Sequence, residues 1–548
     1  MWSMVRITIT TEASVGSGVS LSESGGLPER DDGNLLIYNA HLFTGIRHTE
    51  AVLIRNGIVE CAGDNLSVLR AAAQDDRIRR IDAEGRLVLP GMVDAHMHLV
   101  ETGVEMMMGQ VRGYASIRKM VDDMRKRCLG IPFLISGGWD EENFVEHRLP
   151  DRYDLDMISA DKPVMLFRFC HHVVSVNSFV IEKCGLERAP DIPGGITKRD
   201  ESGSVTGVLI DRAMDNIAEL RRELISSVAG DAVRVAVEYA LSRGLTTLMP
   251  LDADSVEFET CMNMASGREL KCRLRMFLTA QYFATLGESG YAGNHDDMFH
   301  LCGVKLFADG SFGGRTAHLS APYEDDPTSG LCLMDEEELV KHMTMARERG
   351  MMVAAHAIGD RAIESVLAAA EKTGLEGQNL RLEHVAFTPP GVIQKIGSFR
   401  PTVVVQPHFL VGDWWLPDRL GKRCSDCYLF RTFTSMGLRP VGSSDSPVEP
   451  LDPWTGIITA VDRGKHAGVR IADLTAGEAL DPETAVLMYT AWAGAASGEE
   501  HKLGMLEPGS YGDAVMMAEK SIESAMSHPA VLMTVVAGRV RYKSADCV

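Results

Sequence analysis

The sequence is short of positive charge: 55 Lys and Arg residues stand against 76 Asp and Glu, a formal net charge of −21 over 548 residues. Nucleic acids and anionic membranes are bound by cationic surfaces, so this balance argues against both as partners. No apolar run reaches the ~18 residues that span a bilayer. Only 11 cysteines occur, too few for a disulfide scaffold of this length, so we expect a reducing, cytoplasmic environment.

The composition, 45% hydrophobic and 24% charged, is typical of an ordinary globular protein and excludes a chain that is mostly disordered. A chain of this length suggests more than one domain. Residues 1–33 differ from the rest because Ser, Gly and charged residues dominate them. They lack the basic start and apolar centre of a signal peptide, so we predict a flexible N-terminal extension.

Short alternating runs at both ends of the chain predict β-strands. Residues 35–62 contain two such runs joined at Asn56-Gly57, a strong hairpin signal, and residues 513–542 have a similar texture with a turn at Ala537-Gly538. Neither end alone has enough strands for a stable core. We therefore expect one small sheet domain, built from both ends of the chain over 34–90 and 501–548.

The middle of the chain alternates strand-like and helix-like segments. This alternation predicts an α/β fold, a (β/α)8 TIM barrel over 91–500. The first two strands are separated by a gap that holds strand and helix patterns of its own, so we predict an inserted subdomain at about 115–235. The eight expected strands are 93–99, 245–252, 272–280, 303–309, 351–357, 380–385, 402–408 and 439–445.

Residues that suit a metal ion recur at the ends of these strands. His96 and His98 are two apart on a strand, so both imidazoles face the same side. Later strands add Lys305, His356, His384 and Asp445, several of them near the carboxyl ends where barrel enzymes build their sites. Taken singly, each has a structural explanation: a lysine that reaches solvent, a hydrogen-bonded core histidine, or an aspartate that caps a helix. Their joint occurrence in barrel register favours a metal centre.

These motifs resemble the amidohydrolase superfamily, and within it the amidohydrolase-3 (YtcJ-like) metal-dependent hydrolases. The resemblance runs from about Leu35 to Tyr542 and implies a barrel with a sandwich built from both termini. It also implies a one- or two-metal centre that hydrolyses amide-type bonds. The segments that carry it are LVLPGMVDAHMHL, GGWDEENF, GVKLFADGSFGGRTA, AAHAIGDRAI, LRLEHV, VQPHFL, GSSDSPVEPLDPW and LGMLEPGSYGDAV.

The resemblance implies a role for each candidate ligand. His96 and His98 would hold one divalent ion, expected to be Zn²⁺, and Asp445 would contact that ion and move protons as a catalytic residue. His356 and His384 would hold a second ion. Lys305, converted by CO₂ to a carbamate, would bridge the two. A bound metal makes hydroxide available near neutral pH.

Further residues are expected at the substrate pocket: Trp139, Asp140, His172, Arg315 and His408. His172, which aligns with a histidine of the family, is the second candidate catalytic residue, although a structural role is an equal alternative. Trp139 could equally belong to the core of the insert. His171 stands where the family has glycine, and its side chain is expected to narrow the pocket. The Cys424–Cys427 pair has no second cysteine pair nearby, which argues against a metal or redox site there.

The sequence thus predicts a hydrolase that cleaves a C–N, amide-type bond of a small molecule with a metal-activated hydroxide. Two alternatives stay open: a mononuclear deaminase-like hydrolase, and an inactive binding protein on the same fold. The deaminases place a Glu three residues past a barrel histidine, whereas Phe387 occupies that position after His384. A homodimer is an open possibility for the assembly.

Overall fold

The computed structural model describes residues 32–73, 75–168, 172–190, 192, 194–286 and 297–545. The extension predicted over 1–33 lies outside these residues except for its last two positions. His171 also lies outside them.

Eight parallel strands form the central sheet and confirm the predicted TIM barrel. Each strand pairs with the next one along the chain, from β8 to β20, and an isolated bridge between Met97 and Ser446 joins the last strand to the first. Each of the eight predicted runs overlaps one of these strands, and six contain the whole strand. They are β8 (Met92–Met97), β14 (Leu245–Pro250), β15 (Arg273–Thr279), β16 (Phe299–Phe307), β17 (Met352–Ala357), β18 (Leu380–His384), β19 (Thr402–Val405) and β20 (Val441–Gly442).

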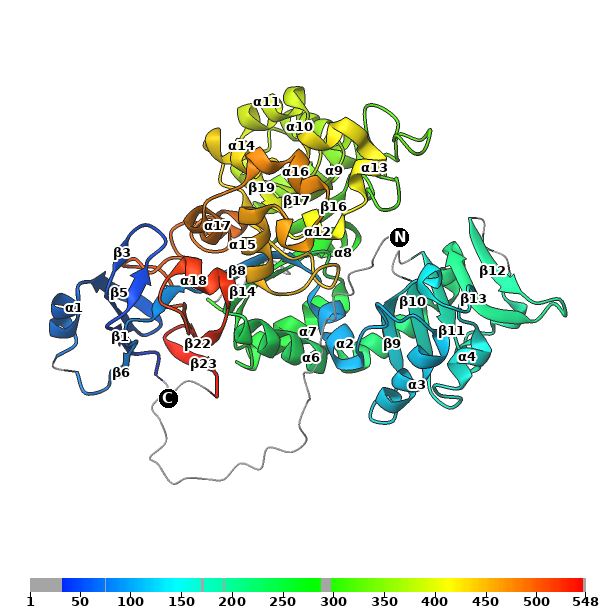
Figure 1. Cartoon of the computed structure of the whole chain (residues 1–548), viewed down its shortest axis with the longest axis horizontal. Helices are drawn as coiled ribbons and strands as arrows, with labels where there is room; N and C mark the ends of the chain where they lie inside the picture. The colour runs from blue at the N-terminus through cyan, green and yellow to red at the C-terminus, as the bar shows by residue number, and fades with distance from the viewer. Residues whose placement is uncertain are drawn as a thin grey trace, which may run out of the picture.

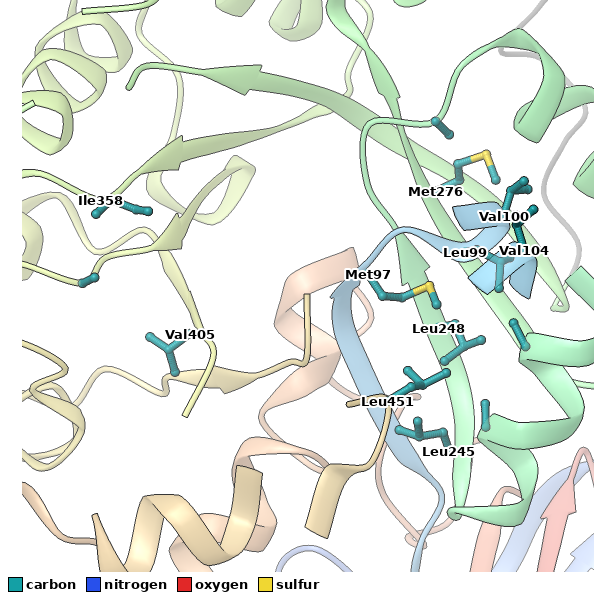
Figure 2. Close-up of a cluster of buried hydrophobic side chains, with 14 of the residues drawn as sticks. Met97, Leu99, Val100, Val104, Leu245, Leu248, Met276, Ile358, Val405 and Leu451 are labelled. Carbon is teal, nitrogen blue, oxygen red and sulfur yellow. The ribbon is translucent and has the colours of Figure 1, made fainter. Parts of the chain in front are cut away.

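Helices separate these strands and cover the barrel. Figure 2 shows Leu245 and Leu248 of β14 in one buried cluster with Met97 of β8. Residues of α2 (Leu99–Met108), the helix that follows β8, belong to the same cluster. Burial on both faces explains why the strands read as nearly continuous apolar runs. The helices after β14 are α7 (Ser255–Ser266), α8 (Ala280–Thr285), α9 (Glu336–Glu348), α10 (Asp360–Thr373), α11 (Pro390–Phe399), α12 (Phe409–Gly412), α13 (Leu416–Leu420), α14 (Phe430–Ser435), α15 (Pro453–Asp462), α16 (Ile471–Leu474), α17 (Pro482–Met488) and α18 (Ile522–Ser527).

Capping chemistry sets the limits of these helices, as α9 illustrates. The Asp335 carboxylate accepts a hydrogen bond from the Glu338 amide, and Gly350 follows the helix with a φ of 66°. A carboxylate at the start satisfies a free amide there, and glycine adopts the left-handed conformation after the end without steric cost. None of the helices within the described ranges is long and apolar enough to cross a membrane.

The two ends of the chain meet in one six-stranded sheet, where β21 pairs antiparallel with β7. Figure 1 shows these ends side by side, in blue and red. Positive φ angles at Asn56, Gly57, Ala537 and Gly538 form the predicted hairpin turns. The six strands are β2 (His41–Phe43), β3 (His48–Thr49), β7 (Leu87–Pro90), β21 (Ala514–Met517), β22 (Val531–Val536) and β23 (Arg539–Lys543).

A four-stranded sheet lies beside it, and one buried apolar cluster takes residues from both sheets. Its strands are β1 (Leu35–Tyr38), β4 (Ala51–Arg55), β5 (Ile58–Gly63) and β6 (Arg79–Asp82), with helix α1 (Asn65–Ala71) between β5 and β6. The sandwich arrangement and the exact domain boundaries stay predictions.

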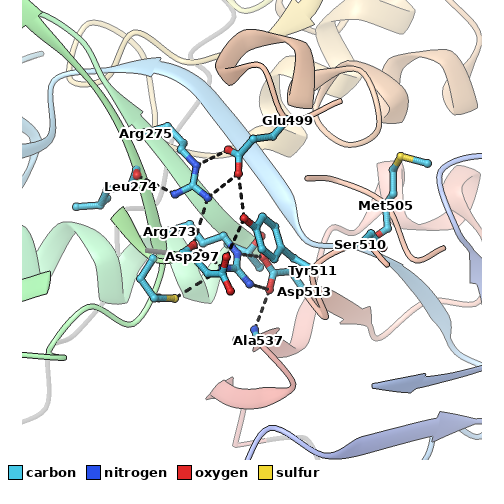
Figure 3. A network of polar contacts seen from close by, with 12 residues as sticks. Arg273, Leu274, Arg275, Asp297, Glu499, Met505, Ser510, Tyr511, Asp513 and Ala537 are labelled. Carbon is cyan, nitrogen blue, oxygen red and sulfur yellow. Dashed lines mark hydrogen bonds and ion pairs between the residues drawn. The ribbon is translucent and has the colours of Figure 1, made fainter. Parts of the chain in front are cut away.

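Buried ion pairs join the barrel to the C-terminal segment (Figure 3). Arg273 of β15 makes two hydrogen bonds to Asp513, of 2.6 and 2.9 Å. Two residues further along the strand, Arg275 bonds to Glu499, and the Tyr511 hydroxyl donates to that carboxylate at 3.0 Å. The arginines are completely buried, so their charges depend on these partners.

Between β8 and β14 the chain forms a separate five-stranded sheet, which Figure 1 shows at the side of the barrel. Helix α2 (Leu99–Met108) leads into this segment and α6 (Ala218–Ser242) leads back to β14. Its elements are α3 (Ile117–Cys128), β9 (Leu134–Trp139), α4 (Arg152–Asp156), β10 (Val164–Arg168), β11 (Val173–Val176), α5 (Ser178–Lys183), β12 (Gly195–Arg199) and β13 (Val205–Asp211).

Candidate metal centre

Closure of the barrel brings His96, His98 and Asp445 together. The Asp445 backbone amide donates a hydrogen bond to the His96 carbonyl at 2.7 Å, which ties the loop after β20 to the end of β8. Asp445 Oδ1 then lies 3.3 Å from Nε2 of His96 and 3.3 Å from Nε2 of His98. The ligand atoms of the three residues all lie within 4.8 Å of one another.

This group fits a divalent cation. Asp445 Oδ1 is buried and is one of the side-chain atoms in the described structure without a hydrogen-bond partner. A buried polar atom left unpaired costs ~1–3 kcal/mol, and a cation between the carboxylate and the two imidazoles would remove that cost. Two imidazoles and a carboxylate are a donor set that suits Zn²⁺.

The charges of Asp445 and His96 suit a bound cation, whereas without a metal His98 is protonated and paired with Asp445, so a metal would displace that proton. Burial alone would raise the pKa of Asp445, but the neighbouring histidines hold that pKa well below its usual range, so the carboxylate is ionised. Burial, with the charge of Lys305, lowers the pKa of His96 to about 4. Burial acts in the same direction on His98, but the Asp445 carboxylate outweighs it and raises the pKa of His98 to about 9.

The other three predicted ligands lie next to this group. Lys305 of β16 points its Nζ at Nε2 of His96, 3.5 Å away. The His384 ring is centred 5.0 Å from the His96 ring and 4.4 Å from the His356 ring. Burial lowers the pKa of Lys305 and of both histidines, which for His384 falls to about 3. A neutral imidazole is the form that binds a metal, and a neutral amine is the form that adds CO₂.

Outer hydrogen bonds orient three of the four imidazoles. His96 Nδ1 lies 2.7 Å from Glu383, and His384 Nδ1 lies 2.8 Å from the Gln406 side chain. His356 Nε2 lies 2.9 Å from the Gly310 carbonyl oxygen, which leaves Nδ1 to bind a metal. Such partners fix the ring and its protonated nitrogen.

Asp309 orients the turn around His356. Its buried carboxylate accepts hydrogen bonds from the amides of His318, Ile358 and Gly359 at 2.8–3.0 Å. Burial nevertheless raises the pKa of Asp309 to about 7.

Sequence reasoning missed Glu383 and Gln406. Glu383 is completely buried and bonds to Arg381 Nε at 2.7 Å, and Arg381 is buried as well. Despite burial, Arg381 and His96 hold the pKa of Glu383 well below its usual range. The usable signal was a pair of opposite charges, two residues apart, inside the apolar run LRLEHV.

The three pocket residues predicted on the insert do not join the metal ligands in any contact described below. Trp139 is completely buried, its indole N–H donates to the Leu166 carbonyl at 2.8 Å, and this position favours the core alternative. Asp140 pairs with Arg168 at 3.2 Å. His172 is mostly exposed, with Nδ1 2.9 Å from Asp211. Within the described ranges, no recorded contact joins these residues to the metal group, and their roles stay predictions.

The two pocket residues predicted on the barrel lie in loops at the carboxyl ends of its strands. His408 follows β19, and its Nδ1 lies 2.6 Å from Glu449. The next residue, Phe409, stacks on the His384 ring at 6.0 Å. Arg315 pairs with Asp325 at 2.7 Å. The stacking of Phe409 therefore places the residue next to His408 against a predicted metal ligand.

Two other features lie apart from this group. Cys424 and Cys427 are buried, and the only metal-compatible cluster within the described ranges is the His96 group. A cavity of about 1060 Å³ opens at the opposite end of the barrel, where His300, Met352 and Glu499 are among its lining residues. Barrel sites form at the carboxyl ends of the strands, so this cavity is separate from the candidate centre.

Comparisons with known proteins agree with this geometry. A family model described as "Amidohydrolase family" matches residues 79–542. The putative amidohydrolase YtcJ of Bacillus subtilis is 31% identical over 511 residues, 90% of this chain and 96% of that protein. The N-substituted formamide deformylase of Arthrobacter pascens is 25% identical over 93% of this chain and 98% of its own.

Among solved structures, an uncharacterized metal-dependent hydrolase from Pyrococcus horikoshii superposes with a TM-score of 0.82 at 29% identity, covering 90% of this chain and 99% of that one. The barrel and its His-His-Asp group thus define a metal-dependent hydrolase. The chain belongs to the amidohydrolase family.

Proposed function

We propose that this protein hydrolyses a C–N, amide-type bond of a small-molecule substrate. The observation that carries the proposal is the buried Oδ1 of Asp445, which accepts no hydrogen bond within the described residues and lies 3.3 Å from Nε2 of both His96 and His98. The relative named N-substituted formamide deformylase supports the choice of bond, since its name describes removal of a formyl group from nitrogen.

His96, His98 and Asp445 would hold one divalent ion, expected to be Zn²⁺, and His356 and His384 a second. When bound, the metal would act as a Lewis acid that makes water nucleophilic at neutral pH. Asp445 is ionised, so it accepts the proton of the attacking water. It then returns that proton to the leaving nitrogen, which departs as a neutral amine. His96 stays neutral throughout because burial disfavours its protonation.

Lys305 would carry the carbamate that joins the two halves of the site. Its neutral amine attacks CO₂, a C–N bond forms, and one proton leaves to solvent, so the product is an anion with two oxygens. Burial favours the neutral amine. The 3.5 Å separation of Nζ from Nε2 of His96 supports this assignment because it places the new oxygens beside a ligand.

The test is a panel of N-formyl and N-acyl amines, lactams and esters, assayed with the zinc-loaded protein and with Asp445→Asn. We expect hydrolysis of amide-type members and a loss of roughly 10²- to 10⁴-fold in kcat for the variant. Asp418→Asn is the matched control because Asp418 is an exposed aspartate that pairs only with Arg470 among the ion pairs described. Hydrolysis of esters alone, or full activity of Asp445→Asn, would refute the proposal.

Lys305→Ala tests the carbamate. This variant should lose metal and activity, and a short-chain carboxylic acid should restore part of the activity by supplying carboxylate oxygens. Lys395→Ala, which removes an exposed lysine paired with Glu364, should change neither. A Lys305→Ala variant with full metal content and turnover would leave a mechanism based on Asp445 without a carbamate.

A further inference from the structure

The His408 side chain has one recorded hydrogen-bonding contact within the described residues, and that contact is with Glu449. Nδ1 of His408 lies 2.6 Å from Oε2 of Glu449, and the two side chains are 18% and 11% exposed. The other ring nitrogen, Nε2, has no recorded partner among these residues, and it is not one of the buried atoms left unpaired. Nε2 therefore reaches solvent, whereas Nδ1 is engaged.

This pair lies at the carboxyl end of the barrel, beside the metal group. His408 begins α12, three residues after β19 ends, and the neighbouring Phe409 ring stacks on the His384 ring at 6.0 Å. Glu449 belongs to the loop after β20, four residues past Asp445. Barrel enzymes build their substrate pockets from the loops at this end. The open Nε2 of His408 is thus carried by loops of the kind that surround a substrate.

The backbone of α12 leaves space for the Glu449 carboxylate at a glycine. Gly412 ends α12, and a Cβ added there would lie 2.1 Å from Oε1 of Glu449, with no backbone atom in the way. Gly412 does not have a positive φ, so alanine is compatible with its backbone. Alanine at this position would displace the carboxylate from His408. The contact between Glu449 and His408 therefore depends on space that only glycine leaves.

A simple tie between the two loops is the competing explanation for the contact. Such a tie already exists deeper in the barrel, where Gln406 Nε2 donates to Ser443 Oγ at 2.9 Å and β19 pairs with β20. Both of these side chains are buried. The contact between His408 and Glu449 is not needed to join the loops, and what it fixes is the orientation of an imidazole that reaches solvent.

We propose that Glu449 is a positioning residue for His408, and that Nε2 of His408 accepts a hydrogen bond from an N–H group of the substrate. A carboxylate only accepts, so the proton of the neutral ring is on Nδ1 and Nε2 is left as an acceptor. Glu449 thus selects both the tautomer and the orientation of the ring. This inference rests on the proposed function and narrows the substrate to amides that carry an N–H group.

The test uses two probes that differ by one methyl group: N-butylformamide, which has an N–H group, and N-butyl-N-methylformamide, which has none. KM, kcat and Tm are measured for the zinc-loaded wild type, for Glu449→Ala, Gly412→Ala and His408→Ala, and for the double variant Glu449→Ala/His408→Ala. Glu483→Ala is the matched control, because Glu483 pairs with His48 at 3.0 Å where both side chains are more than half exposed.

A footprint that needs no turnover accompanies the kinetics. Diethyl pyrocarbonate modifies accessible, unprotonated imidazole nitrogens, and mass spectrometry locates the modified histidines. We expect His408 to react in the wild type, and we expect N-butylformamide to protect it.

For Glu449→Ala and Gly412→Ala we expect the KM for N-butylformamide to rise roughly 3- to 10-fold, the worth of one hydrogen bond, with kcat unchanged. Glu449→Ala should add nothing once His408 is replaced by alanine. No variant should alter the KM for the methylated probe. An unchanged KM for N-butylformamide, or a full effect of Glu449→Ala in the His408→Ala background, would overturn the inference.

Failure of the proposed function would look different. A wild type that hydrolyses no member of the amide panel would refute the proposed function. If the wild type hydrolyses neither formamide, the footprint decides on His408 by itself, and a His408 that is unreactive, or that N-butylformamide does not protect, would overturn the inference.

Discussion

Replacing Glu383 with Gln should separate the metal affinity of the site from the stability of the barrel. Glu383 is buried between two donors: Arg381 Nε at 2.7 Å and His96 Nδ1 at 2.7 Å. A glutamine has one oxygen and one NH₂ group, so it can accept from one of these donors only, and its NH₂ group then faces the other. In either orientation the Arg381 charge loses its buried counterion.

The magnitude follows from burial. Neither Arg381 nor Glu383 has any exposed side-chain surface. Removing one member of such a pair costs ~3–5 kcal/mol, while the remaining bonds of Arg381, to the carbonyls of Ala95 and Ala496, keep it in place. The loss of an outer partner of His96 should separately weaken metal binding by roughly 10- to 100-fold.

The assay is denaturant unfolding of the metal-free protein, followed by metal titration. Glu364→Gln is the matched control because that glutamate pairs with Lys395 and Arg361 at the surface; its cost should not exceed ~1 kcal/mol. If metal-free Glu383→Gln were as stable as the control, the buried charge pair would not stabilise the barrel and the reasoning would be wrong.

This residue also sets a pH dependence. The folded-state pKa of Glu383 lies below its usual value of 4.5, so its contribution to stability is fully present above that value. It is lost as the pH falls towards the folded-state pKa. The metal-free wild type should therefore lose stability below about pH 4.5 more steeply than Glu383→Gln. Parallel pH profiles of the two proteins would contradict this assignment.

Three further outcomes are expected. Arg273→Met should destabilise the protein by ~3–5 kcal/mol because it leaves Asp513 buried without its counterion, whereas Arg234→Met at the surface should not; equal denaturation midpoints would argue against the network in Figure 3. Trp139→Ala should cost ~3–5 kcal/mol with unchanged metal content; a changed KM with full stability would place Trp139 in the pocket instead. Chelation should lower the Tm of the zinc-loaded wild type, because a metal at 100 times its Kd stabilises the folded protein by ~2.7 kcal/mol. The Tm of Asp445→Asn should not change on chelation.

Local patterns in the sequence were enough to predict the barrel. Period and composition mark its eight strands because burial on both faces demands apolar residues at nearly every position. Turn chemistry is equally local: Asn56 and Gly57 both adopt positive φ angles, which Asn-Gly tolerates better than most residue pairs. His96 and His98 were recognisable for the same reason, since two residues on one strand face the same side wherever the strand lies.

The tertiary structure alone decided how the centre is completed. Glu383 lies 287 positions from His96, and no local pattern connects them until the barrel closes. The same closure places Asp445 Oδ1 between two imidazoles, because the backbone amide of Asp445 donates a hydrogen bond to the His96 carbonyl of the neighbouring strand. Trp139 shows the converse: its motif suggested a pocket, yet packing buries its ring among the strands of the insert. The function of a buried charge or ring depends on the side chains around it. When those side chains are distant in sequence, tertiary packing brings them together, and local periodicity does not predict them.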